Sequence, residues 1–220
     1  MKRLPRIHFV ILFLALSSTC LSAATIVSTY DGTQQDGSKL DADQSSGKAL
    51  AFTMPSGGAT YVLDDITLRL YIPGDVSLTD ISLSLWSNGA SNSPDTELLT
   101  FTNPTFTSGA TASFTFTPDS TFYLEPSTSY WVAVQNVTSA DVYWRASASG
   151  NYFDSSIGAT SGAGAHTGYY GNGSPSEWTL TSSLINSYTI NATVVPESST
   201  YACILGVLVG LLAACRRKRK

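Results

Sequence analysis

The sequence predicts an all-β protein whose strands form an antiparallel two-sheet sandwich, either jelly-roll or immunoglobulin-like in connectivity. The middle of the chain is rich in Ser, Thr, Gly, Tyr and Phe and shows no convincing helical pattern. Apolar and polar residues alternate there with a period of two, and clusters of Pro, Gly, Asn and Asp separate the alternating segments.

Alternation is clearest in segments 66–72, 81–86 and 112–117, where one face of each expected strand is apolar. Segment 130–134 is apolar throughout, which is typical of a central strand buried on both faces. Shorter β-rich runs predict six further strands, at 25–29, 49–54, 97–102, 141–147, 177–181 and 187–195. In contrast, the glycine-rich segment 148–175 predicts a long mobile loop or a weak hairpin.

The first 24 residues have the pattern of a secretory signal peptide, with a basic start, an apolar run over 9–16 and small residues at the end. We expect signal peptidase to cleave between Ala24 and Thr25. Cys20 leaves a lipoprotein alternative open, although the three residues before it are Ser and Thr rather than a typical lipobox. The surface domain is therefore expected to span residues 25–195.

The last residues, 196–220, have the pattern of a membrane address. An apolar segment at 201–215 is expected to form a transmembrane helix, and it is followed by a basic membrane stop made of Arg216, Arg217, Lys218, Arg219 and Lys220. Fifteen helical residues span only about 22 Å, which is shorter than a hydrocarbon core of about 30 Å. Snorkelling basic side chains can cover the difference, so an ordinary membrane anchor is one interpretation.

The order of these parts resembles the bacterial PEP-CTERM sorting signal. The corresponding sorting motif is Val195, Pro196 and Glu197, and Ser198 stands where the family usually has a second proline. The resemblance implies recognition by an exosortase, a membrane-embedded cysteine-type transpeptidase or protease, close to this motif. It also implies an inner-membrane location before processing, and then release to the cell surface or the extracellular polysaccharide.

Charge and cysteine content limit the possible functions of the domain between the two terminal targeting segments. Residues 25–195 contain four basic and fifteen acidic residues, a net charge of −11, which argues against a nucleic-acid partner. The three cysteines all lie in the terminal targeting segments, at Cys20, Cys203 and Cys215. We therefore expect neither a disulfide framework nor a thiolate metal site in the domain, and no cofactor.

Candidate catalytic groups are few. His166 is the single histidine of the domain, and we expect it to lie in a solvated loop rather than in a Ser-His-Asp site. Two acid pairs, Asp41 with Asp43 and Asp64 with Asp65, could act as glycosidase carboxylates or calcium ligands, but structural roles are favoured. We predict no catalytic residue and no metal site.

The tryptophans are the most suggestive side chains, because sugars stack on exposed aromatic faces. Trp86 is out of phase with the apolar residues of its strand, and together with Trp178 it is a candidate glycan contact. Trp131 and Trp144 are expected in the core.

Residues 44–150 resemble the choice-of-anchor surface domains of bacteria, specifically the type R group. The resemblance is carried by segments 61–68, 83–86, 98–99 and 124–132, the last of which matches an L-x-P-x-T-x-Y-W pattern. It implies a fold and a surface role and carries no catalytic residue. The sequence thus predicts an exported, exosortase-processed, non-enzymatic protein, adhesive or structural within exopolysaccharide. The alternatives are a carbohydrate-binding module that uses exposed aromatics and, less favoured, a polysaccharide hydrolase.

Overall fold

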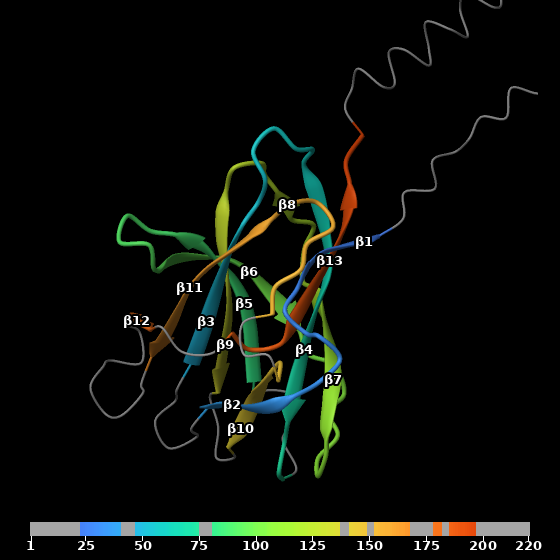
Figure 1. Cartoon of the computed structure of the whole chain (residues 1–220), viewed down its shortest axis with the longest axis vertical. Coiled ribbons are helices and arrows are strands. Elements are labelled where there is room, and N and C mark those ends of the chain that lie inside the picture. The colour runs from blue at the N-terminus through green and yellow to red at the C-terminus, as the bar shows by residue number, and fades with distance from the viewer. Residues whose placement is uncertain are drawn as a thin grey trace, which may run out of the picture.

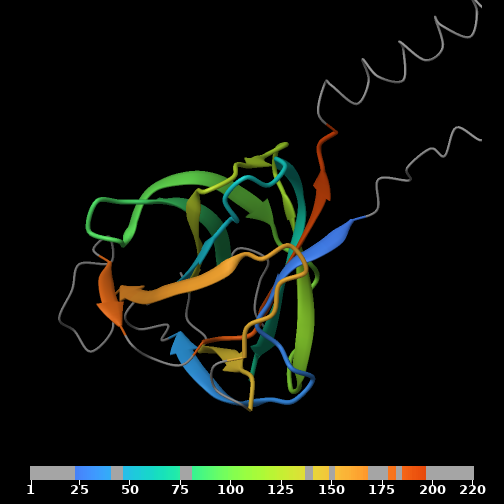
Figure 2. The same ribbon diagram turned by 45° about the horizontal axis from the view of Figure 1, so that its top comes forward.

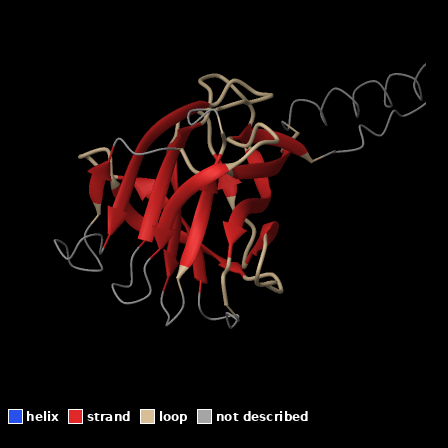
Figure 3. Cartoon of the chain, turned by 60° about the horizontal axis from the view of Figure 1, so that its bottom comes forward, coloured by secondary structure: helices blue, strands red, loops and turns tan. Residues whose placement is uncertain are grey.

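The computed structural model describes residues 23–40, 47–74, 81–136, 141–148, 152–167, 178–181 and 185–196. Across these residues the chain forms strands, turns and loops and no helix, so the prediction of an all-β protein is confirmed (Figure 3). The strands are β1 (Ala24–Ser28), β2 (Gln35–Leu40), β3 (Gly47–Thr53), β4 (Tyr61–Tyr71), β5 (Ile81–Asn88), β6 (Pro94–Thr102), β7 (Thr111–Pro118), β8 (Tyr123–Leu124), β9 (Ser129–Asn136), β10 (Val142–Ala146), β11 (Thr160–Thr167), β12 (Thr179–Thr181) and β13 (Tyr188–Val194).

All strand pairs are antiparallel, and they form two sheets that face each other in a sandwich-like arrangement (Figure 1). Sheet A has the order β1-β13-β4-β7. In addition, β8 and β10 pair with β4, and β2 pairs with β10. Sheet B has the order β6-β5-β9-β3-β11-β12. A short β6–β7 pairing at Phe101–Pro118 and Thr102–Thr117 joins the sheets along one edge.

The pairing is nested along the chain. β5 pairs with β6, β4 with β7, β3 with β9, and β1 with β13, so each pair encloses the one before it in sequence. Successive pairs alternate between sheet B and sheet A until the outermost pair, β1 with β13, completes sheet A.

The main core lies between the sheets and explains the alternation seen in the sequence. On β4, Ile66, Leu68 and Leu70 are fully buried, and Phe116 on the neighbouring β7 faces the same interior. Sheet B contributes the buried apolar residues of β5 together with alternate residues of β3 and β9. Full burial of one such aliphatic side chain contributes about 1.5–3 kcal/mol, which is what fixes the register of each strand.

Strand β9 is buried on both faces, as its unbroken apolar sequence predicts. Tyr130, Val132 and Val134 face the main core, whereas the residues between them face outward from sheet B. There a second apolar group forms, called here the outer cluster. Its buried members are Ala49, Ala51, Trp131, Ala133 and Ala165, with Trp86, Ala163 and Trp178 partly buried against them.

Of the two expectations for segment 148–175, the long mobile loop is wrong for part of the segment, and the strand found there is closer to the hairpin alternative. β11 occupies Thr160–Thr167, pairs with β3 on one side and with β12 on the other, and places the backbone of His166 in a strand rather than a loop. Its Gly, Ala and Ser residues have little β propensity of their own, so pairing with β3 gives it strand structure. β2 and β8 were also not predicted.

Both ends of the described domain lie at the same edge of sheet A, because β1 and β13 pair with Ala24 opposite Ala192 (Figure 2). Ala24 and Thr25, the predicted cleavage pair, are the first residues of β1, and the cleavage stays a prediction. At the other end the Val195 N–H donates to Thr60 O at 2.9 Å. The rest of the sorting tail, from Glu197 on, lies outside the described residues, as does most of the signal peptide.

No helix in the described ranges has the length and hydropathy that a bilayer crossing requires. The predicted transmembrane helix at 201–215 and the basic stop at 216–220 are not among those ranges.

Candidate functional site

Trp86 and Trp178, the predicted glycan contacts, meet on the outer face of sheet B. Their ring centroids are 5.9 Å apart with an interplanar angle of 73°, an edge-to-face contact. Trp86 Nε1 donates to Ser84 Oγ at 2.7 Å, and both tryptophans pack against the outer cluster. Much of their ring surface is therefore already in contact with protein.

Trp131 and Trp144 are fully buried, which confirms that they belong to the interior. Trp131 lies opposite Trp86 on the neighbouring strand, and its Nε1 donates to Asn88 Oδ1 at 2.8 Å. Trp144 lies in the main core and donates from Nε1 to Ser187 O at 2.9 Å. Both indole N–H groups are satisfied, so burial leaves no unmet polar group on either ring.

An open concave surface lies at one end of sheet B and is called here the end groove. Ser87 and Asn88 from the end of β5, Leu98 of β6 and residues of the segment 122–130 line it, and its volume is about 570 Å³. The β5–β6 hairpin thus forms one side and the β8–β9 turn the other. This turn contains the L-x-P-x-T-x-Y-W pattern noted in the sequence.

Two large apolar side chains of the end groove remain in water. Tyr123 is 50% exposed and Leu98 is 40% exposed. Leu98 is displaced by an irregularity in the β5–β6 ladder, because Leu85 pairs with Leu99 whereas Trp86 pairs with Glu97. A bulge of this kind redirects a side chain away from its expected alternation. Both side chains are more exposed than Trp86 and Trp178, which are partly buried.

The polar groups of the end groove lie on a turn that several hydrogen bonds hold in place. The Ser127 N–H donates to Pro55 O at 3.1 Å, with Ser127 at a φ of 57°, and Thr128 Oγ1 donates to Pro126 O at 3.1 Å. Glu125 is fixed twice: its N–H donates to Tyr130 Oη at 3.0 Å, and its Oε2 accepts from Thr60 Oγ1 at 3.0 Å.

One carboxylate, that of Glu125, is the charged group among the described residues that line the end groove. Burial raises the pKa of Tyr130 above its usual value, against the opposing effect of the Glu125 N–H, so this phenol stays neutral. No lysine, arginine or histidine is found among the described residues that line the groove. Glu125, which is exposed, therefore gives the groove its negative charge.

The acid pair Asp64 and Asp65 has structural partners in sheet A. Asp64 Oδ2 accepts from Thr193 Oγ1 at 2.7 Å, and Asp65 Oδ1 accepts from Asn191 Nδ2 at 2.8 Å. Burial raises the pKa of Asp65, with the neighbouring Asp64 adding to the rise and the bond from Asn191 opposing it. Both carboxylates thus tie β4 to β13.

The other candidate acids, Asp41 and Asp43, lie outside the described residues. Within the described ranges, no three His, Cys, Asp or Glu side chains come close enough together to hold a metal ion.

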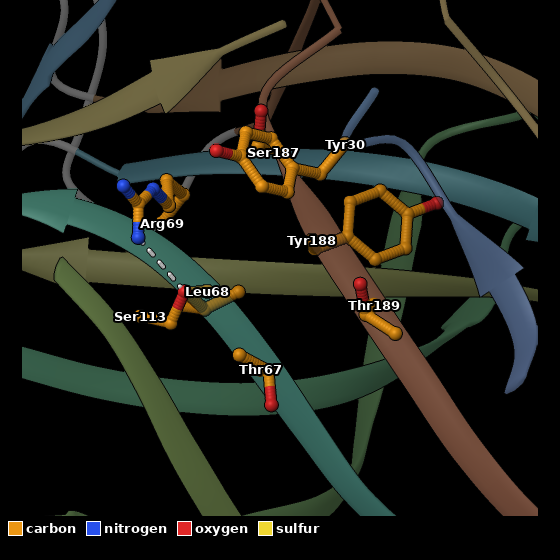
Figure 4. Close-up of a pocket in the computed structure, with 8 residues that line it drawn as sticks. All are labelled: Tyr30, Thr67, Leu68, Arg69, Ser113, Ser187, Tyr188 and Thr189. Atoms are coloured by element: carbon orange, nitrogen blue, oxygen red, sulfur yellow. Dashed lines mark hydrogen bonds between the residues drawn. The ribbon is translucent and has the colours of Figure 1, made fainter. Parts of the chain in front are cut away.

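A small crevice on sheet A is lined by polar and aromatic residues (Figure 4). The Arg69 guanidinium lies 5.2 Å from the centre of the Tyr30 ring and donates from Nη1 to Ser113 Oγ at 3.0 Å. Ser187 Oγ, also at this crevice, is buried without a hydrogen-bond partner among the described residues. The crevice volume of about 20 Å³ suits a single water molecule and is too small for a sugar.

Lys48 is the one buried cation recorded in the described core. Its Nζ donates to Ser38 Oγ at 2.7 Å, and that hydroxyl donates in turn to Asn186 Oδ1 at 3.2 Å. Burial lowers the pKa of Lys48 to about 8. The ammonium sits between the sheets, so it is not available to a polymer at the surface.

Comparisons with known proteins give no relative from which a function could be taken. No family model, no curated protein and no solved structure matches this chain. The functional interpretation therefore depends on the geometry of the end groove and of the outer cluster.

Sequence reasoning did not identify the end groove. Tyr123 follows Phe122 just before a turn and has no periodic partner, and Leu98 looks like an ordinary strand residue beside Leu99. Asn88 could be recognised as a turn residue next to Gly89, but not as the acceptor for a buried tryptophan. The only signal that pointed there was the turn pattern at 124–132, which indicates structure rather than binding.

Proposed function

We propose that this chain is an exported, non-enzymatic surface protein whose domain adheres to extracellular polysaccharide through the end groove. The observation that carries the proposal is the exposed Tyr123 ring in a groove of about 570 Å³ beside hydrogen-bonding groups that face water. Small-molecule sites commonly have volumes of roughly 300–1,000 Å³, so one or a few sugar residues fit.

The chemistry of the end groove matches the two sides of a sugar ring. The apolar C–H face of a pyranose packs against an aromatic or aliphatic surface, which Tyr123 and Leu98 supply. Sugar hydroxyls need donors and acceptors, and Ser127 and Asn88 are both exposed there. Asn88 Oδ1 is occupied by Trp131, which leaves the amide nitrogen to donate outward.

The connectivity supports a jelly roll rather than an immunoglobulin-like sandwich. Sheet A contains β1-β13-β4-β7 and sheet B contains β3-β9-β5-β6, and these eight strands pair as nested hairpins that alternate between the sheets. Jelly rolls occur in lectin domains among others, but one fold hosts many functions. The fold is thus compatible with glycan adhesion, and the groove is the reason to propose it.

For the terminal segments we propose the route that the sequence resembles. A signal peptide is removed between Ala24 and Thr25, and an exosortase recognises Val195, Pro196 and Glu197. The pairing of β1 with β13 supports this route, because it brings both ends of the domain to one edge of sheet A. Replacing Pro196 and Glu197 by Ala should leave a full-length, membrane-bound form, detected by fractionation and intact mass.

The adhesion is tested by isothermal titration calorimetry of the full chain in detergent against a panel of soluble oligosaccharides. Tyr123→Ala should weaken binding at least about tenfold, since aromatic anchors often carry more than 1.4 kcal/mol. Tyr152→Ala removes a partly exposed tyrosine elsewhere on the domain and should leave affinity unchanged. Binding that survives Tyr123→Ala and is lost in Trp86→Ala would move the site to the outer cluster.

A further inference from the structure

We propose that the end groove selects an amino sugar with a free ammonium group, which pairs with the Glu125 carboxylate. This inference rests on the proposed function, because it names the class of sugar that the same groove accepts. It follows from three observations: the fixed position of Glu125, the lack of a compensating cation among the described residues of the groove, and the charge of the domain.

Glu125 is positioned before any ligand arrives. Thr60 holds one carboxylate oxygen, Oε2, at 3.0 Å, and Tyr130 holds the backbone N–H. The following turn is anchored to Pro55 through the Ser127 N–H. A group already ordered in this way loses little conformational entropy on binding. Oε1 has no hydrogen-bond donor among the described residues and is left for a ligand.

The described lining of the end groove offers this carboxylate no counter-charge of its own. Arg69 and Arg145 interact elsewhere, over the rings of Tyr30 and Tyr71, and Lys48 is buried between the sheets. Residues 25–195 carry a net charge of −11. A field of this sign repels uronate-rich or sulfated polymers and attracts cationic ones, so an ammonium on the ligand completes the site.

The remaining contacts orient the same sugar. The ring face lies on Tyr123 and Leu98, and the Asn88 amide nitrogen and the Ser127 hydroxyl meet the ring hydroxyls. Tyr123 and Glu125 are only two residues apart in the chain and both line the groove, so a single ring can reach both. An N-acetylated sugar keeps the stacking contact and the hydroxyl contacts but loses the ion pair.

A lipid surface is the competing occupant of the groove. Thr60 contacts both the groove and Val195, and Val195 lies next to the expected membrane tail. The Thr60 carbonyl accepts from the Val195 N–H, and its hydroxyl donates to Glu125. An acidic groove without a cation in its described lining disfavours anionic headgroups, whose binding depends on lysine and arginine. The sugar is therefore favoured, and vesicle binding becomes an outcome of the test.

The test compares oligomers of glucosamine, N-acetylglucosamine, glucose and a uronic acid by calorimetry with the full chain in detergent. Glucosamine oligomers should bind about tenfold more tightly than their N-acetylated or neutral counterparts, a preference that falls as salt is raised. Glu125→Gln should abolish this preference while leaving the weaker neutral binding. Glu97→Gln removes the same charge from an exposed residue that faces Trp86 across the β5–β6 ladder, outside the groove, and should preserve the preference.

The outcomes separate the two proposals. If Tyr123→Ala abolishes binding but Glu125→Gln keeps the preference for the amine, adhesion stands and the ion pair is wrong. The same holds if Glu97→Gln reduces the preference as much as Glu125→Gln, because general charge attraction then explains it. If no oligosaccharide binds, or if the chain binds anionic vesicles instead and Tyr123→Ala removes that binding, both proposals are overturned.

Discussion

The outer cluster and the end groove are neighbours on sheet B, yet they use aromatic side chains in opposite ways. In the outer cluster, Trp86 and Trp178 contact each other and pack against buried alanines and the buried Trp131. In the end groove, Tyr123 is half exposed. Asn88 joins the two regions, since it lines the groove and accepts from Trp131 Nε1.

This difference shows that exposure, rather than residue type, separates a stabilising aromatic from one that can bind a ligand. Tryptophan is the usual residue to suspect in a glycan site, but a ring already packed against protein has little apolar surface left for a ligand. A half-exposed tyrosine keeps such surface, and burying it against a ligand contributes about 25 cal/mol per Å² of apolar area. The outer cluster is thus expected to govern stability, and the end groove to govern binding.

The sharpest test of the comparison is Trp131→Ala at the centre of the outer cluster. The free energy of unfolding should fall by about 3–5 kcal/mol, because a large buried ring leaves a cavity. The Asn88 acceptor also loses its donor. Urea unfolding followed by circular dichroism measures the loss, with Trp131→Phe as the milder control. A loss below about 1 kcal/mol would mean that the outer cluster is not a stabilising core.

The second test uses pH and Lys48, which sits on the inner face of β3, the strand whose outer face supplies Ala49 and Ala51. Its pKa is about 8 in the folded chain, against an ordinary value of 10.5 that applies to the unfolded chain. Between these values the unfolded chain binds more protons, so stability should rise with pH, by on the order of 2–3 kcal/mol.

Urea midpoints measured from pH 7.5 to 10 check this rise, and Lys48→Met should flatten it. Above about pH 10 the raised pKa values of Tyr130 and Tyr188 act in the opposite direction, so the window ends there. A flat profile for the wild-type chain would show that the ammonium is better solvated than its burial indicates.

A third test overpacks the outer cluster. A Cβ added at Gly162 would lie 2.5 Å from the Cβ of Ala51, so Gly162→Ala forces β11 away from β3. Overpacking of this kind costs about 1–3 kcal/mol. Gly74 has nothing within 4 Å of an added Cβ, which makes Gly74→Ala the matched control. Equal stability of the two variants would show that β11 is loosely docked.

The smallest stability effect is expected at Tyr123, and it completes the comparison. Tyr123→Ala should change the free energy of unfolding by less than about 0.5 kcal/mol, as surface substitutions usually do. Trp86→Ala should cost about 1–2 kcal/mol through lost packing, with oligosaccharide affinity retained. Parallel unfolding and binding curves for the two variants test this crossed pattern. Any result in which Trp86 controls affinity and Tyr123 controls stability would reverse the assignment.

The sequence was sufficient for the strands whose apolar pattern shows which faces are buried. Alternation at 66–72 predicted which residues of β4 face the core, and the apolar run at 130–134 predicted burial of β9 on both faces. The prediction for β4 succeeds because a slip of one residue would expose every apolar side chain of that strand. The prediction for β9 succeeds because a strand that is apolar at every position has no polar face to present to water. The acidic charge of the domain and the absence of cysteine from it are likewise properties of the sequence alone.

Only the tertiary structure decided which strands pair, and hence where a ligand could bind. β11 is a strand because β3 pairs with it, which its own Gly, Ala and Ser residues do not predict. The end groove joins residues 87–98 to residues 122–130, and Glu125 is held by Thr60 from a third segment. Local sequence patterns do not predict such contacts, because the contacts depend on how the two sheets pack against each other. They also depend on a bulge that directs the Leu98 side chain toward solvent.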